Sequence, residues 1–332
     1  MSAARFIQLV AATFASVAFL APLAIAGSSS GGYRLLDHEP ALTMYLSAPQ
    51  LGRPGSEVEV YSNAARGDIA RIVIFVPARY TLDLARPAGA SVGRAAARDV
   101  AGNGAIVPLT AASPSAHAGN PCAPGAHEAV WEFSAGVSQV TAIPVFVDRT
   151  TGADTALGAY KLELCLPPAA ALGINVRRVN LALQPLVNPT AAGTYTWRSL
   201  VTPYIGGVAS QPNTFEVRAR VPLPMQLTLR AKVQRRSQPV VLSGRYVAAG
   251  SVSGFPVELW VRRGRTWRYV TSVRTDHRGR YSFRRRVRTT SVFGTNTNGV
   301  TDCATGSTAP AGCINETITQ VFSPSVRVRP RR

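Results

Sequence analysis

The chain has 332 residues and carries 36 Lys and Arg against 17 Asp and Glu, a formal net charge of +19 at pH 7. Only Lys161 and Lys232 are lysines, and a GC-rich genome produces such an arginine bias through its codons, so the amount of arginine alone is weak evidence for function. The position of the charge is more informative. Residues 1–216 have a balance of +1 and residues 217–332 a balance of +18, which predicts two domains with different surroundings or partners.

The first 26 residues have the pattern of a secretory signal peptide. Arg5 precedes an uncharged run that ends at Ala26, and the small residues Ala24 and Ala26 suit cleavage after this position. A run of this length is also long enough for an uncleaved membrane anchor, but Pro22 and the small residues favour cleavage. No second hydrophobic segment follows. We therefore expect an exported chain with no transmembrane span after cleavage, either secreted or associated with the cell envelope.

Alternation of hydrophobic and polar residues begins after a predicted lead-in at residues 27–40. The alternation is interrupted by Gly, Pro, Asn and Ser turns, which is typical of an all-β protein. It predicts one large antiparallel β-sandwich domain over residues 41–222, with about ten strands. The expected strands are 42–48, 57–63, 70–77, 80–84, 128–135, 139–147, 158–167, 174–183, 193–204 and 213–221.

Residues 86–125 interrupt this rhythm with a long stretch rich in small residues, Pro and Gly. The stretch is too long for an ordinary loop, and we predict an irregular lobe with a short helix over residues 93–101. A long loop on a rigid sheet is where a binding site of this domain would be expected first. A surface insertion without a binding role is the alternative.

Cys122, Cys165, Cys303 and Cys313 are the four cysteines. An even number of cysteines in an exported protein predicts disulfides, and four cysteines allow three connectivities. We expect neighbours to pair, Cys122 with Cys165 and Cys303 with Cys313. The chain has no CxxC motif and its four histidines are scattered, so we predict no metal site and no other cofactor.

A second domain is predicted over residues 226–330. The two prolines in "VPLP" (221–224) cannot serve in a central strand, so the first domain is expected to end there. A fresh alternating run then starts at residue 225. The expected strands are 225–233, 240–247, 255–263, 265–275 and 280–287, with a long polar loop over 294–313 and a closing strand over 316–330.

A series of motifs marks this second domain. In order they are Ser243-Gly244-Arg245, Gly254-x-Pro256-Val257-x-Leu259, Gly264, Trp267 and Thr275-Asp276-x-x-Gly279-x-Tyr281-x-Phe283. The order resembles bacterial Ig-like sandwich modules and is similar to the carboxypeptidase-regulatory-like, transthyretin-type group of exported proteins. The resemblance covers about a third of the chain and implies a fold, not an activity. With the generic Ig-like character of residues 33–222, it predicts an all-β fold of two antiparallel Ig-like β-sandwich domains after a signal peptide.

Side chains on a strand alternate between its two faces. Alternation places Tyr281 and Phe283 in the core, and it also directs Trp267 and Tyr269 inward as packing residues. The remaining outward residues predict an arginine stripe, with Trp260 as a further candidate, that would contact anionic polymers in a salt-sensitive way. A solubilising surface shaped by codon bias is the alternative. The stripe consists of Arg262, Arg268, Arg274, Arg280, Arg284 and Arg286.

Sequence motifs for catalysis are lacking. GxSxG, HExxH, GxxxxGK[ST] and GxGxxG do not occur, so we predict no enzymatic activity. Asp37-His38-Glu39 is the densest titratable cluster and is interpreted as part of the lead-in. His127-Glu128 is interpreted as a polar loop near a disulfide. Oxygen ligands for Ca²⁺ at Asn296, Asn298 and Asp302 lack the EF-hand spacing, and a turn explains them as well.

These observations favour an exported non-catalytic protein with a structural or binding role at the cell envelope or outside the cell. Its expected partners are cell-wall or other anionic polymers, or glycans, and no sequence-specific contact with nucleic acid is expected. A carbohydrate-binding or accessory module of a carbohydrate-active system is the alternative. Tyr195, Trp197 and Tyr204 would stack on sugar in that case, although core or edge packing also explains them.

Overall fold

The computed structural model describes residues 40–46, 48–63, 65–134, 142–232, 239–297, 299–301 and 315–329. Nearly all regular elements in these ranges are β-strands, which confirms the predicted all-β fold. Helical structure is limited to the 3-10 turns η1 (Gly152–Ala156) and η2 (Gln211–Asn213) and one α-helical turn, α1 (Ala169–Leu172). No helix in the described ranges is long and apolar enough to cross a membrane.

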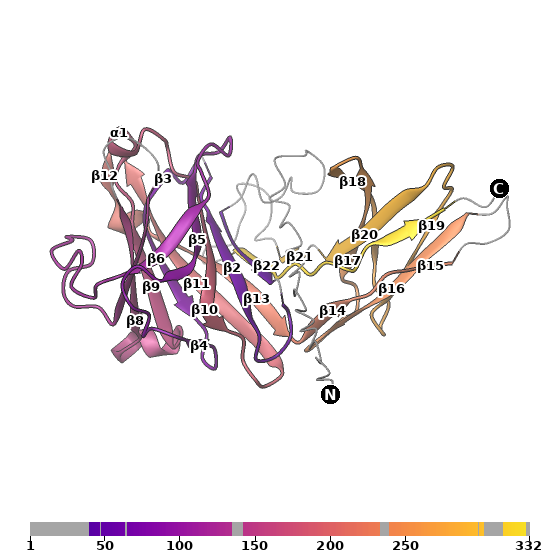
Figure 1. Ribbon diagram of the computed structural model, residues 1–332, viewed down its shortest axis with the longest axis horizontal. Coiled ribbons are helices and arrows are strands. Elements are labelled where there is room, and N and C mark those ends of the chain that lie inside the picture. Colours follow the sequence, from indigo (N-terminus) through magenta and orange to yellow (C-terminus); the bar gives the residue numbers. More distant parts are fainter. Residues whose placement is uncertain are drawn as a thin grey trace, which may run out of the picture.

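The larger half of the protein is built from one sheet of fifteen strands (Figure 1). All of its pairs are antiparallel except the parallel pair β13–β22. The neighbours follow the order β1-β2-β10-β5-β6-β7-β8-β9-β3-β11-β13-β22-β21, with β4 beside β10 and β12 beside β11. In chain order the strands are β1 (Ala41–Leu46), β2 (Pro54–Tyr61), β3 (Asp68–Val76), β4 (Thr81–Leu82), β5 (Ser91–Arg98), β6 (Val107–Ala112), β7 (Ala129–Phe133), β8 (Ile143–Arg149), β9 (Tyr160–Cys165), β10 (Arg178–Val187), β11 (Gly193–Ile205), β12 (Val208–Ala209), β13 (Phe215–Leu223), β21 (Gly299–Thr301) and β22 (Asn315–Ile318).

The two ends of this sheet meet, so the sheet encloses one core. β1 contacts β13 and β22 although they are far from it in the strand order, and Tyr45 forms a parallel bridge with Gln320. The alternating apolar residues of the strands fill the space inside. Trp131 and Trp197 are fully buried there, which places the largest side chains of the domain at its centre.

The lobe predicted at 86–125 contains two strands, β5 and β6, so the predicted helix over 93–101 is wrong. Ala95 and Ala97 belong to the core of the sheet, and Ala96 between them is buried as well. Gly93 permits the pairing with β10, because a Cβ at this residue would lie 1.9 Å from the carbonyl oxygen of Ala182. The small residues therefore serve a crowded central strand and not a helix.

The smaller half of the protein contains two four-stranded sheets (Figure 1). Their inner faces share one core, with Leu242 and Phe283 from one sheet and Leu259 and Phe293 from the other. The hydroxyl of Tyr281 lies 2.9 Å from the Thr295 hydroxyl and links the two layers. One sheet consists of β14 (Met225–Leu227), β15 (Arg230–Lys232), β16 (Val240–Ala248) and β19 (Arg280–Arg285); the other consists of β17 (Pro256–Arg263), β18 (Thr266–Arg274), β20 (Ser291–Thr297) and β23 (Val326–Val328).

The closing strand predicted at 316–330 is split between the two halves. β22 joins the large sheet beside β13, where Thr317 is buried and its hydroxyl donates to the carbonyl oxygen of Leu42. β23 then pairs with β20 in the smaller half. Pro324 lies between these strands and has no N–H to donate to a ladder, which agrees with the interruption.

Candidate functional site

Several residues predicted from the sequence lie outside the described ranges. They are the signal peptide, the lead-in cluster Asp37-His38-Glu39, the second cysteine pair Cys303 and Cys313, and two of the three oxygen donors considered for Ca²⁺, Asn298 and Asp302. The second disulfide therefore stays a prediction.

Cys122 and Cys165 form a disulfide, which confirms the first predicted pair, with the two Cα atoms 6.1 Å apart. The bond attaches the loop between β6 and β7 to the end of β9. Glu163 is the one other possible metal-ligating group beside the two sulfur atoms in the described residues. Its carboxylate is paired with Arg71 at 2.6 Å, so the surroundings of the disulfide are explained by structural contacts.

His127 fixes the same loop from the other side. Its Nδ1 lies 2.9 Å from the Asp148 carboxylate, and its Nε2 lies 3.1 Å from the carbonyl oxygen of Ala123. The ring also packs on Phe146, with 4.3 Å between the ring centroids. These contacts describe the polar loop beside a disulfide that the sequence indicated.

The residues considered for glycan stacking do not form a platform. Trp197 is fully buried and Tyr195 is 9% exposed, and both make edge contacts with the buried ring of Tyr80. Tyr204 is half-buried, and its hydroxyl donates to the carbonyl oxygen of Leu166 at 2.6 Å. Alternation along β11 directs Tyr195 and Trp197 into the core, so the packing interpretation is the right one for both.

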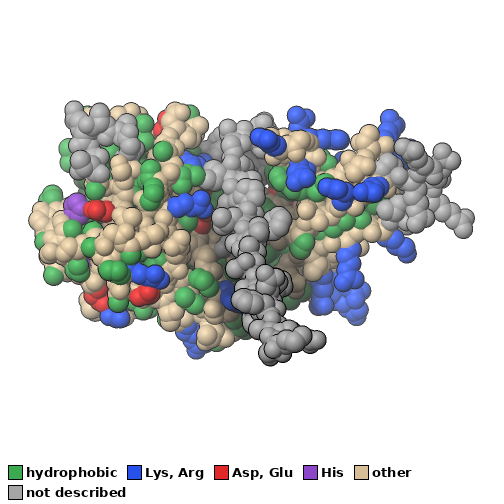
Figure 2. Space-filling model, viewed as in Figure 1, with side chains coloured by type: hydrophobic (Ala, Val, Ile, Leu, Met, Phe, Trp, Pro, Cys, Tyr) green, Lys and Arg blue, Asp and Glu red, His purple; other side chains and the backbone are tan. Residues whose placement is uncertain are grey.

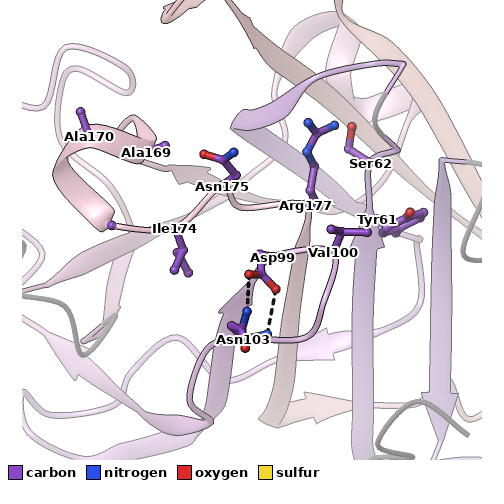
Figure 3. Close-up of a pocket in the computed structure, with 11 residues that line it drawn as sticks. Tyr61, Ser62, Asp99, Val100, Asn103, Ala169, Ala170, Ile174, Asn175 and Arg177 are labelled. Carbon is purple, nitrogen blue, oxygen red and sulfur yellow. Dashed lines mark hydrogen bonds between the residues drawn. The ribbon is translucent and has the colours of Figure 1, made fainter.

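A hollow of about 860 Å³ lies beside α1 and the turn at Asp99–Asn103 (Figure 3). The Asp99 carboxylate accepts the backbone N–H of Asn103 at 2.8 Å and its side-chain N–H at 2.6 Å. Burial opposes the ionisation of Asp99, but the hydrogen bonds from Asn103 and from backbone amides of the turn outweigh it and lower the pKa. Arg177 is paired with Asp68 at 2.6 Å. The two charged groups that line the hollow, Asp99 and Arg177, are therefore already engaged in contacts within the protein.

Glu57 and Glu59 form a carboxylate pair on the outer face of β2. The side-chain amide of Asn180 donates to both, at 3.4 Å to Glu57 and 2.7 Å to Glu59. Burial raises the pKa of Glu57, the charge of Glu59 raises it further, and the hydrogen bond from Asn180 opposes the increase. The pair has no hollow of its own among the cavities found in the described residues.

We expect Glu57→Gln to unfold at higher denaturant concentration than the wild type at pH 7. A carboxyl group with a raised native pKa binds its proton more tightly in the folded chain, so its stabilising contribution is lost as the pH rises from about 4.5 through the native pKa. The neutral amide of glutamine does not lose stability as the pH rises, and its oxygen still accepts the hydrogen bond from the side-chain N–H of Asn180. Denaturant titrations at pH 7 and at about pH 4 measure the difference. An equal advantage at both pH values would contradict the assignment.

The predicted arginine stripe is wrong as a single surface. Arg280 and Arg284 lie on the outer face of β19, in the sheet with β16, whereas Arg262 and Arg274 lie on the outer face of the other sheet. Arg268 is at the end of the β17–β18 hairpin and Arg286 follows β19. All six are exposed. Two packed sheets have outer faces that point in opposite directions, which alternation within single strands does not reveal.

One of these two outer faces is purely cationic. We define the basic face as the outward charged residues of β15, β16 and β19. Arg245 and Arg280 are direct cross-strand partners, an arrangement in which like charges repel. In the same sheet Lys232 and Arg284 both pair with Val241. The members of the basic face are Arg230, Lys232, Arg245, Arg280 and Arg284, all of them exposed.

The basic face lacks ion pairs within the described structure, and Asp276 beside Arg280 is the acidic group that interacts with it electrostatically. No member makes an ion pair there, whereas arginines of the larger half pair with acids, for example Arg198 with Glu216. Asp276 in the adjoining turn accepts the backbone N–H groups of Arg280 and Arg278, each at 2.8 Å, and the bond from Arg280 contributes most to lowering the pKa of Asp276. Figure 2 shows Lys and Arg gathered over the smaller half of the molecule.

The inward assignment of Trp267 and Tyr269 is wrong as well. The pairing of β17 with β18 shifts register between Leu259 and Trp260, which is a β-bulge. Leu259 pairs with Thr271 before the shift, and Trp260 pairs with Tyr269 after it. Because one extra residue exchanges the two faces of a strand, Tyr269 points outward and is 39% exposed. Trp267 is half-buried on the same outer face.

Comparisons with known proteins identify no family. No family model and no curated protein matches the chain. Similar solved structures include a tetra-tandem repeat in the extending region of a large adhesion protein, with 12% identity over 87% of this chain and 74% of that chain, at a TM-score of 0.20. They also include dimeric latent PorU from Porphyromonas gingivalis, with 10% identity over 87% of this chain and 34% of that chain, at a TM-score of 0.20. Such TM-scores are too low to support a conclusion about function.

Proposed function

We propose that the protein is an exported, non-catalytic β-sandwich protein with a structural or binding role at the cell envelope or outside the cell. Its basic C-terminal domain binds anionic polymers there. The N-terminal sequence has the pattern of an export signal, and the disulfide between Cys122 and Cys165 suits an oxidising compartment. The basic face supplies the contact surface.

The observation that carries this proposal is the cross-strand pair Arg245–Arg280. Arg245 and Arg280 are directly opposite each other on adjacent strands of a rigid sheet, so their positive charges repel each other when no anion is present. A polymer with repeated negative charges relieves this repulsion and contacts several members of the basic face at once. Each exposed contact contributes only about 0–1 kcal/mol, so binding depends on their number and on salt.

We expect Arg280→Ser/Arg284→Ser to weaken binding of long-chain inorganic polyphosphate and to reduce the dependence of the affinity on salt. Polyphosphate presents charge without rings or sugar, so it tests the electrostatic contact alone. The wild type should bind at about 20 mM salt and lose most of its affinity at about 0.5 M, because mobile ions screen exposed charges. Titration of labelled polyphosphate at several salt concentrations measures both quantities.

Arg86→Ser/Arg149→Ser is the matched control. It removes the same formal charge from the larger half, where Arg86 pairs with Asp83 and Arg149 with Glu128. We expect this variant to bind almost as the wild type does. Equal weakening by both double variants would show that net charge alone acts, and binding that survives 0.5 M salt would exclude the electrostatic mechanism.

The carbohydrate alternative receives less support. Its candidate residues Tyr195 and Trp197 are inside the core of the large sheet. Tyr204 is tied to Leu166 through its hydroxyl.

A further inference from the structure

The outer face opposite the basic face combines aromatic rings with arginines. We define the aromatic face as Trp260, Arg262, Trp267, Tyr269 and Arg327, which share the outer side of the sheet formed by β17, β18, β20 and β23. Arg262 pairs with Trp267 on one side and with Val292 on the other, and Val292 pairs with Arg327. Across the sheet, the indole of Trp267 in β18 is thus followed by the exposed guanidinium groups of Arg262 in β17 and Arg327 in β23.

Trp267 lies across the surface of this sheet. Its backbone is in β18, and its six-membered ring reaches over β17 as far as Gly294 in β20. A Cβ at Gly294 would lie 3.3 Å from two carbon atoms of this ring. Glycine at this position therefore leaves room for the indole, which remains half-buried and accessible from solvent.

The neighbouring rings are fixed in orientation. The indole N–H of Trp260 donates to Asn296 at 2.8 Å and to Glu258 at 3.1 Å, and both partners are buried. Tyr269 meets Trp260 edge to face, with 5.8 Å between centroids and 76° between planes. Because these two rings are nearly perpendicular, they do not form the flat common surface on which consecutive sugars of a chain would lie.

Arg262 and Arg327 are exposed and make no ion pair within the described part of the chain. Aromatic rings interleaved with unpaired arginines on one exposed sheet face are the combination that binds single-stranded nucleic acid. Each base stacks on a separate ring, and the cations neutralise the phosphates between bases. Separate ring orientations are compatible with this ligand, because a flexible single strand presents each base independently.

We propose that the aromatic face binds single-stranded nucleic acid without sequence preference. One base stacks on Trp267 and a second on Tyr269, while Arg262 and Arg327 contact phosphates. Duplex nucleic acid does not bind in this way, because its bases are already stacked inside the helix. This site is separate from the basic face and does not depend on its function.

Binding of fluorescently labelled oligo(dT) by the full chain tests this proposal. We expect Trp267→Ala to raise the dissociation constant about tenfold or more, because stacking contributes roughly 1–3 kcal/mol per base. Oligo(dT) should also quench the tryptophan fluorescence of the wild type, and this quenching should decrease in Trp267→Ala. Tyr269→Ala provides a second variant at an exposed position that does not endanger folding. Arg262→Ser/Arg327→Ser should lower the salt slope by about 1.4, which corresponds to two phosphate contacts on a single strand.

Three competitors and one control variant separate the outcomes. Duplex DNA and polyglucuronate should reverse the quenching by oligo(dT) only weakly, because the basic face can bind them without contact to the aromatic face, and Arg280→Ser/Arg284→Ser should leave this quenching intact. The proposal is overturned if Trp267→Ala and Tyr269→Ala leave the affinity unchanged, if polyglucuronate reverses the tryptophan quenching more effectively than unlabelled oligo(dT) does, or if oligo(dT) does not bind. Polyphosphate, the third competitor, carries no rings. If polyphosphate alone does not bind, the proposal for the basic face is contradicted and the proposal for the aromatic face still stands.

Discussion

Replacing Phe283 with Ala is expected to lower the free energy of unfolding by about 3–5 kcal/mol. Phe283 is 3% exposed on the inner side of β19, where it pairs across strands with Leu242 and meets the ring of Tyr281 at 5.8 Å. Alanine at this position leaves a cavity between the two sheets of the smaller half, and a rigid sandwich core closes such a cavity only in part. Denaturant unfolding followed by circular dichroism measures the loss.

Arg284→Ser is the control for this prediction. Arg284 is the next residue of the same strand and is exposed on the opposite face, so its replacement should change stability by no more than about 0.5 kcal/mol. A large and equal loss in both variants would mean that the inner and outer faces of β19 have been exchanged.

The faces of β19 are predictable from sequence because this strand is short and unbroken. Tyr281 and Phe283 alternate with Ser282 and Arg284, and the structure buries the first two. Local alternation is sufficient when every residue of a strand has one partner on its neighbour.

The aromatic face illustrates where this reasoning fails. Regular alternation on β18 continues through Val270, but the bulge makes Val270 an extra residue between the partners of Leu259 and Trp260. Nothing in the residue types of β17 and β18 marks the extra residue, since it depends on how the two strands align. Regular alternation therefore assigns Trp267 and Tyr269 to the core and gives no indication of an exposed aromatic face.

Long-range pairing explains the other differences. The sequence of β5 is rich in alanine, which favours a helix in isolation, but its neighbours β10 and β6 impose an extended conformation. Similarly, β22 reads as part of the closing strand of the second domain, although its partner β13 is about a hundred residues earlier. Residues so far apart in the chain contain no local signal of their contact.

The disulfide is expected to have a second large effect on stability. Replacing Cys122 and Cys165 together with Ala should lower the free energy of unfolding by roughly 4 kcal/mol, because the bond closes a loop between residues 43 apart in sequence and restricts the unfolded chain. The double substitution is preferable to a reducing agent, since a reductant would also act on any disulfide formed by Cys303 and Cys313. Denaturant titration of both proteins without reductant measures the change.

The surroundings of the bond provide the control and the contradicting result. His127 holds Ala123, the residue after Cys122, by a hydrogen bond to its carbonyl oxygen, and Asp148 on β8 anchors the same ring. If these contacts alone kept the loop in place, the double substitution would cost less than about 1 kcal/mol and the chain-entropy argument would fail for this loop.

His127→Phe keeps the packing on Phe146 but removes both hydrogen bonds, so we expect it to cost less than the cysteine replacement. The opposite order would show that the loop depends mainly on the imidazole. The expected order instead assigns the main constraint on this part of the large sheet to the covalent bond.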